Sequence, residues 1–265
     1  MLYALPTACQ GLIQAYAGLD FGHQRLVPVP YYKNNPRLRR LSTPVDAGKG
    51  APHDLVEETK ARALERRVLF DQLTADGVRS FMIKEGIGID CSGFAARVLD
   101  LLLRDRLSRS IADVITPAAN SWWRAFLFRF RPFQNIDVRT LTDTRNAQMI
   151  PLSSLAPGDL IRTRGGNHVL LVTETERDEQ GVLQSFRYWH SSGQFGDDSG
   201  IREGRVIISD PAKDLAEQEW KELWQGKAIS RDGWMEERGK NGLFRLKALI
   251  TQNSNVKSQN HISKP

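Results

Sequence analysis

The sequence predicts an α+β fold in which helical segments come first and an antiparallel β-sheet follows. Apolar residues recur at helical spacing in the first half of the chain, where Pro52 opens one helix and Asp90 precedes another. From Leu152 onward, short β-branched or aromatic runs alternate with Gly and Asp, as in a series of hairpins. Helices followed by paired strands are typical of an α+β domain.

The composition is that of a folded protein. The 265 residues are 40% hydrophobic and 26% charged, which suits one large domain with a buried core. No apolar run reaches the roughly 20 residues that cross a bilayer, and the N-terminus lacks the basic start of a secretory signal. We therefore expect a cytoplasmic location or non-standard export. The net charge of +6 favours an anionic polymer or membrane surface as partner, and we expect no specific nucleic-acid contact.

The sequence predicts a division of the chain into three parts. Residues 1–75 are expected to form a helical and irregular segment whose role is open. Residues 76–251 are expected to form the main domain, and the polar residues 252–265 a disordered tail.

An arginine-rich stretch with aromatic residues covers residues 104–147 of the main domain and reads as an insertion. It contains Trp122, Trp123 and Arg124. One interpretation is a half-buried strand or loop with solvated arginines. The other is a surface that binds an anionic ligand or touches a membrane, because aromatic rings and guanidinium groups together can stack on or insert into a ligand.

Cys91 is the leading candidate for chemistry. Asp90 is a good N-cap whose carboxylate can accept the Gly93 N–H, which places Cys91 and Ser92 in the first turn of an amphipathic helix. The helix terminus favours a thiolate by only about 0.3–1 kcal/mol, which is less than one pKa unit, or about 1.4 kcal/mol. Asp90 also opposes ionisation. A reactive Cys91 therefore requires a base or a cation, and histidine is the expected supplier.

Two histidines lie at the ends of predicted strands. His168 begins the strand HVLLV and His190 ends the strand LQSFRYWH. A hairpin centred on residue 179 would place them directly opposite, within about 5.5 Å at the backbone. This pattern predicts a Cys91 nucleophile, a His168 base and a His190 that orients the base. A buried structural thiol at Cys91 and a Cys–His–His zinc site stay open as alternatives, although we expect no metal or other cofactor.

The candidate residues lie in motifs that resemble those of the NlpC-type cell-wall cysteine peptidases, a papain-like group. Asp90-Cys91-Ser92-Gly93-Phe94 resembles the DCSGF signature of that family. Pro157-Gly158-Asp159-Leu160, followed by His168-Val169, is similar to its segment with the catalytic histidine. Tyr188-Trp189-His190 resembles the segment with its orienting residue, and the resemblance covers roughly residues 78–195.

The resemblance implies a papain-like cysteine peptidase fold, in which the cysteine-bearing helix packs on an antiparallel sheet. It implies cleavage of peptidoglycan stem peptides, commonly at the bond between D-γ-glutamate and a diamino acid. Asp90 and Ser92 would support the site. The family's usual tyrosine before the cysteine is replaced here by Phe81, which lacks a hydroxyl. Two alternatives stay open: a papain-like amidase, transglutaminase or deamidase acting on another amide, and a non-catalytic binder of anionic wall polymer.

Overall fold

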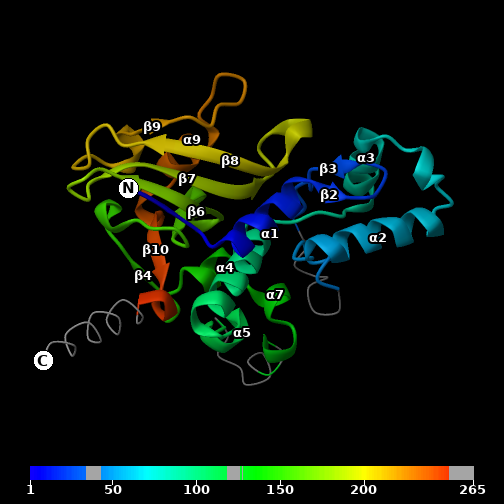
Figure 1. The fold of residues 1–265 in the computed structure, drawn as a ribbon, viewed down its shortest axis with the longest axis horizontal. Helices are drawn as coiled ribbons and strands as arrows, with labels where there is room; N and C mark the ends of the chain where they lie inside the picture. Colours follow the sequence, from blue (N-terminus) through cyan, green and yellow to red (C-terminus); the bar gives the residue numbers. More distant parts are fainter. Residues whose placement is uncertain (34–42, 118–125, 127, 251–265) are drawn as a thin grey trace, which may run out of the picture.

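The structure, a computed structural model, is a mostly antiparallel β-sheet with helices packed against it (Figure 1), so the predicted α+β class is confirmed. It describes residues 1–33, 43–117, 126 and 128–250. Trp122, Trp123, Arg124 and the tail 252–265 lie outside the described residues.

The described helices vary widely in length. The longer ones are α1 (Thr7–Ala17), α2 (Pro52–Glu65), α3 (Ala75–Glu85), α4 (Cys91–Leu107) and α9 (Ile229–Met235). Single turns form α5 (Ile111–Val114), α7 (Pro132–Asn135) and α8 (Val138–Leu141). The 3₁₀ turns are η1 (Phe70–Gln72), η2 (Leu152–Ser154), η3 (Arg164–Gly166), η4 (Gly196–Asp198), η5 (Leu215–Glu217) and η6 (Arg238–Lys240). The expected irregular stretch 104–147 therefore begins inside α4 and contains α5, α7 and α8.

The main sheet of the described chain has eight strands. In sequence they are β1 (Leu2–Ala4), β4 (Ala147–Met149), β5 (Leu160–Thr163), β6 (His168–Arg177), β7 (Leu183–Ser192), β8 (Gly200–Ile207), β9 (Glu219–Trp220) and β10 (Gly242–Leu246). Their spatial order is β4-β10-β5-β6-β7-β8-β9, and β1 pairs with β6. A separate small ribbon pairs β2 (Leu19–Asp20) with β3 (Leu26–Val27). The predicted meander from residue 160 onward is confirmed as β5, β6, β7 and β8.

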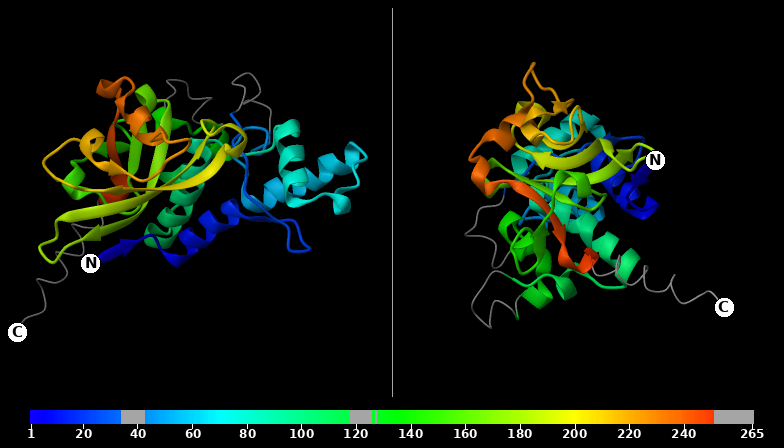
Figure 2. Two further views of the ribbon diagram at one scale, coloured as in Figure 1. Left: turned by 90° about the horizontal axis from the view of Figure 1, so that it is seen from above. Right: turned by 90° about the vertical axis from the view of Figure 1, so that its left-hand side faces the viewer.

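The sheet separates two hydrophobic clusters. Alternate residues of a strand point to opposite faces, and in β6 Val169 and Leu171 join the cluster around α4. Leu170 and Val172 join the other cluster, which contains Trp234 of α9. Figure 2 shows α1 and α4 against the sheet, while α2 and α3 extend beyond its end.

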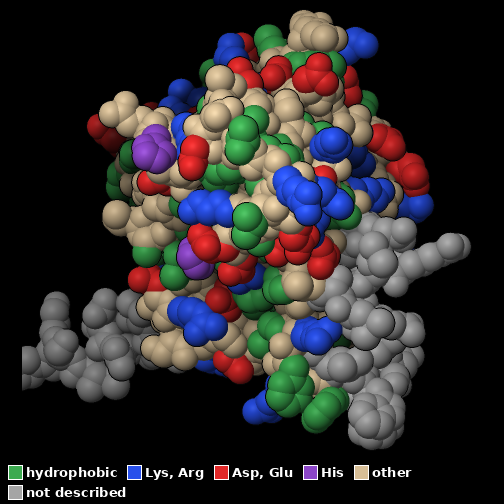
Figure 3. Space-filling model, turned by 90° about the vertical axis from the view of Figure 1, so that its right-hand side faces the viewer, with side chains coloured by type: hydrophobic (Ala, Val, Ile, Leu, Met, Phe, Trp, Pro, Cys, Tyr) green, Lys and Arg blue, Asp and Glu red, His purple; other side chains and the backbone are tan. Residues whose placement is uncertain are grey.

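The surface at the end that carries α2 and α3 mixes both signs of charge. Figure 3 shows Lys and Arg side chains interspersed with Asp and Glu side chains on this face. This face therefore has no continuous positively charged patch among the described residues. In the part of the chain that the structure describes, every helix is too short or too polar to cross a lipid bilayer.

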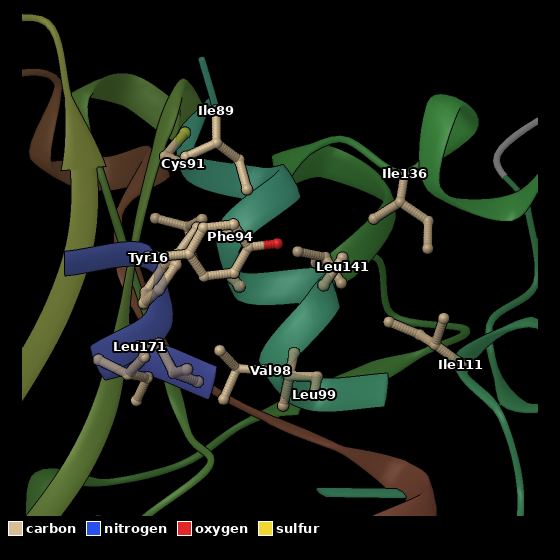
Figure 4. Close-up of a cluster of buried hydrophobic side chains, with 14 of the residues drawn as sticks. Tyr16, Ile89, Cys91, Phe94, Val98, Leu99, Ile111, Ile136, Leu141 and Leu171 are labelled. Atoms are coloured by element: carbon tan, nitrogen blue, oxygen red, sulfur yellow. The ribbon is translucent and has the colours of Figure 1, made fainter. Parts of the chain in front are cut away.

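Helix α4 runs through the larger cluster and carries Cys91 at its N-terminal end (Figure 4). Phe94 and Val98 lie along its buried side, and the ring of Tyr16 from α1 meets Phe94 edge-on at 5.8 Å between centroids. The Tyr16 hydroxyl donates to the Gly50 carbonyl at 2.8 Å. Burial of this helix face fixes the position of its first turn relative to the sheet.

The core crosses the boundary that the sequence placed near residue 75. Strand β1 pairs with β6, and Cys9 and Ile13 of α1 belong to the same buried cluster as α4. Cys9 is fully buried, and its thiol faces the Val98 carbonyl. Strand β1 and helix α1 are therefore part of the main fold.

The β6–β7 hairpin has a different register from the predicted one. Leu171 faces Trp189, whereas a turn centred on residue 179 would place Leu171 opposite residue 187. The observed turn runs from Asp178 to Val182, with Gly181 at a φ of +82°, and register shifts follow it in the ladder. The prediction that His168 and His190 lie directly opposite is therefore wrong. The two residues are instead displaced diagonally on one face of the sheet.

The PGDL motif has a structural role in this fold. Gly158 adopts a φ of +98°, which favours glycine. Asp159 is buried and receives two hydrogen bonds from the Arg245 guanidinium, both at 2.7 Å. This paired geometry ties β10 to the turn that precedes β5.

Candidate active site

Cys91 begins α4, and its first turn is built as predicted. The Asp90 carboxylate accepts the Gly93 N–H at 2.6 Å, which confirms Asp90 as the N-cap. The Ser92 hydroxyl also donates to Asp90, at 3.0 Å. Only 6% of Cys91 is exposed.

The thiol end of α4 borders a surface pocket of about 380 Å³. The lining residues are Tyr31, Lys33, Asp90, Cys91, Ser92, Asp137, Val138, Arg139, Gly166 and Asn167. Cys91 therefore borders an opening on the surface, although most of the cysteine is covered.

His168 lies at the start of β6, and the residue after it reaches the cysteine. The backbone N–H of Val169, the residue after His168, lies against the Cys91 sulfur, as does the N–H of Ser92. His168 is 7% exposed and is not among the pocket-lining residues.

The two predicted histidines meet despite the altered register. His168 Nε2 and His190 Nδ1 are 2.7 Å apart, and the rings are tilted by 71°. Diagonal neighbours on one face of a sheet are within reach of long or aromatic side chains. The structure thus brings His168 and His190 together, and the backbone of Val169 next to His168 reaches Cys91 at the start of α4.

A buried carboxylate extends this pair. Glu222, which follows β9, lies 2.7 Å from His190 Nε2 through its Oε1 and is only 5% exposed. Its Oε2 accepts the Tyr188 hydroxyl at 3.1 Å and also the hydroxyl of Ser230. Sequence reasoning did not find Glu222.

Glu222 is held in its ionised form. Burial raises the pKa of its carboxyl group, but the adjacent His190 ring and its hydrogen bond oppose the effect of burial. Together with the hydroxyl donors Ser230 and Tyr188, they bring the pKa of Glu222 below its ordinary value. An ionised carboxylate can only accept hydrogen bonds.

The ionised Glu222 fixes the tautomers of both imidazoles. His190 must donate its Nε2–H to the carboxylate, so the Nδ1 of neutral His190 is an acceptor. His168 then donates its Nε2–H to that nitrogen. The Nδ1 of His168 is then the ring nitrogen without a proton.

Cys91 and His168 are both uncharged in the resting protein. Burial, with a smaller contribution from Asp90, raises the pKa of Cys91 to about 12, against the opposing effect of Lys49. Burial also holds the pKa of His168 well below 6.5, and the nearby charges of His190 and Arg164 act in the same direction. Proton transfer from sulfur to imidazole therefore has to accompany attack on a substrate and does not precede it.

Gly204 gives Tyr188 the space to reach Glu222. The two residues face each other across β7 and β8. A Cβ atom on Gly204 would lie 2.2 Å from the Tyr188 ring. The tyrosine ring therefore lies flat over the neighbouring backbone, with its hydroxyl directed to the carboxylate.

Phe81, which replaces the tyrosine expected before the cysteine, does not lie at the pocket. Phe81 is half-buried on α3 and is not among the residues that line the pocket. Tyr31 instead places a phenol at the pocket, and burial together with the charges of Cys91 and Asp90 raises its pKa. A Cβ on Gly193 would meet the Tyr31 ring at 2.7 Å, so this glycine admits the ring.

The described residues contain no group of three or more His, Cys, Asp or Glu side chains placed to hold a metal ion. The zinc alternative would need a free nitrogen on each histidine directed at the metal. The facing nitrogens of His168 and His190 are hydrogen-bonded to each other instead.

No family model, curated protein or solved structure matches the chain. The class that the fold supports is therefore an α+β protein with a mostly antiparallel sheet. Its candidate active site combines a helix-terminal cysteine with a carboxylate-linked pair of histidines.

Replacing His168 with Gln should flatten the pH dependence of stability below pH 6.5. The pKa of His168 is depressed in the folded protein, so the unfolded chain binds a proton first as the pH falls. This contribution to the free energy of unfolding is present above pH 6.5 and is lost below it. Urea unfolding at pH 8 and pH 5 measures the loss, with His53→Gln as a control at an exposed histidine. Equal pH dependence in wild type and His168→Gln would contradict the assignment.

Proposed function

We propose that this protein is a papain-like cysteine hydrolase that cuts peptidoglycan stem peptides at the bond between D-γ-glutamate and a diamino acid. One observation carries the proposal: the Val169 N–H contacts a cysteine at a helix N-terminus, and His168, the residue before Val169, begins a buried chain with His190 and Glu222. A thiol nucleophile, a base and an orienting group are the parts that acyl transfer requires.

The chemistry follows from the tautomers. Cys91 Sγ attacks the substrate carbonyl carbon while its proton passes to His168 Nδ1. The C–N bond then breaks, and the departing amine takes that proton from His168, which leaves a thioester on the sulfur. Water adds to the thioester with His168 again as base, releasing the acid and restoring the thiol. Glu222 stabilises the positive charge that forms on the histidine pair.

The start of α4 can stabilise the oxyanion. The N–H groups in the first turn of a helix have no partners within the helix, and the dipole there favours negative charge. Gly93 and Phe94 donate their N–H groups to Asp90. The N–H groups of Cys91 and Ser92 lie nearest the sulfur and are the proposed donors to the developing oxyanion.

The pocket suits a substrate that carries both signs of charge. Lys33 and Arg139 supply cations, and Asp137 supplies a carboxylate. Stem peptides present carboxylates and, on the diamino acid, an ammonium group. This charge distribution supports a wall peptide as substrate.

Digestion of purified muropeptides should test the proposal. The wild-type protein and Cys9→Ala should both release fragments cut at the γ-glutamyl bond, because Cys9 is buried away from the pocket. Cys91→Ala should lose all turnover and keep its fold, since only a sulfur atom is removed. Mass spectrometry of the products separates hydrolysis from deamidation and from transfer to an added amine. Turnover by Cys91→Ala, or tight binding of muropeptides without any cleavage by the wild type, would overturn the proposal.

Glu222→Gln should lower kcat by about 10²–10⁴-fold with little change in KM, because the carboxamide no longer fixes the histidine tautomers. A carboxamide can donate to His190 Nε2, which would reverse the direction of both hydrogen bonds and place a proton on His168 Nδ1. Ser230→Ala, which removes one donor to Glu222 and keeps the carboxylate, is the matched control and should have a much smaller effect. Steady-state kinetics with full activity in Glu222→Gln would contradict this role.

A further inference from the structure

We propose that Lys49 is a positioning residue for the cysteine, whose buried ammonium group fixes the first turn of α4 and balances the charge of Asp90 beside the thiol. This inference rests on the proposed function for its catalytic meaning. Its structural basis and its test are independent of any substrate.

Lys49 is buried to a degree that is unusual for a lysine. It is 1% exposed, and its Nζ donates to Asp90 Oδ1 at 2.6 Å and to Ser92 Oγ at 2.5 Å. These two partners are the residues on either side of Cys91. Lysine is almost never fully buried unless it is paired, so this position has a defined electrostatic role.

The fold is built to admit this side chain. Gly48 adopts a φ of +66°, which favours glycine. Its carbonyl accepts the Asp90 N–H at 3.0 Å, and the Lys49 carbonyl accepts the Arg97 Nε–H at 2.9 Å. These bonds hold the segment of residues 48–50 across the start of α4.

Gly93 is required for the same arrangement. A Cβ on Gly93 would lie 2.5 Å from the Gly48 carbonyl oxygen and 2.7 Å from Lys49 Cδ. The glycine of the DCSGF motif therefore leaves room for the lysine to pass over the helix end. The close approach of Lys49 to Gly93 explains why this position of the motif suits glycine.

Helix capping alone does not need the lysine. The Asp90 carboxylate satisfies the Gly93 N–H without any cation. That carboxylate, however, raises the pKa of the adjacent Cys91 thiol, and Lys49 lowers it. The lysine thus lets the helix keep an acidic cap next to a residue that must develop negative charge.

Other charged and titratable groups also face the thiol. Tyr31 lies on the pocket side. The remaining groups around the pocket and the histidine are Lys33, Asp137, Arg139 and Arg164. None of these groups changes in the substitutions below, so their effects are common to all variants compared.

A purely structural role and an electrostatic role make different predictions. If Lys49 only supports the fold, then removing either Lys49 or Asp90 should change the reactivity of the Cys91 thiol in the same direction. If it balances charge, removing the cation should disfavour the thiolate, and removing the anion should favour it. Losing both should restore the wild-type behaviour.

The test is the rate of iodoacetamide alkylation of Cys91 at pH 8, measured by mass spectrometry of its peptide. Lys49→Met should slow it about tenfold, since each pKa unit changes the thiolate fraction tenfold. Asp90→Asn, which keeps an N-cap oxygen, should speed it about tenfold. The double variant should return to within a few-fold of wild type. Alkylation of Cys9 and circular dichroism serve as controls for folding.

Shifts in the same direction for Lys49→Met and Asp90→Asn, or no shift in Asp90→Asn, would overturn the assignment. The Asp90→Asn and double variants keep the test valid even if Lys49→Met fails to fold. Alkylation requires no turnover, so its outcome is distinct from muropeptide digestion. Opposed shifts without any hydrolysis would uphold the role of Lys49 and reject the proposed function.

Discussion

The hydrogen bond between His190 and the ionised Glu222 is the interaction on which the candidate site depends. It gives direction to a chain of polar groups that is otherwise symmetrical, since either imidazole can donate or accept. With the carboxylate at one end, both imidazoles donate their Nε2–H in the direction of Glu222, and His168 Nδ1 carries no proton. Without it, the same three side chains could face each other in an unproductive tautomer.

The fold brings the parts of this site together from distant regions of the chain. Lys49 comes from the segment before α2, Cys91 from α4, and Glu222 from the loop after β9. Two glycines leave space for side chains of the site. Gly93 leaves space for Lys49, and Gly204 leaves space for the ring of Tyr188, whose hydroxyl donates to Glu222. Lys49 and Asp90 thus form a buried ion pair at the first turn of α4, and Glu222 is a buried carboxylate at the end of the histidine chain.

Features that depend on neighbouring residues in the chain could be predicted from the sequence. The cap at Asp90 and the strands that begin at His168 and end near His190 follow from residue type and spacing, and the structure has them. The hairpin register did not follow, because Gly181 and the irregular ladder shift it. Glu222 and Lys49 were not predicted, since burial and pairing of a charged residue depend on contacts 32 and 41 positions away. A lysine between two glycines was the one local hint of the latter.

The central claim concerns the position of two protons, and nitrogen-15 NMR of the imidazoles at pH 8 measures them directly. The account predicts that His168 and His190 are both protonated at Nε2 and that His168 Nδ1 carries no proton. A spectrum with the proton of His168 on Nδ1 would contradict the account, because the thiol would then face a donor and have no base.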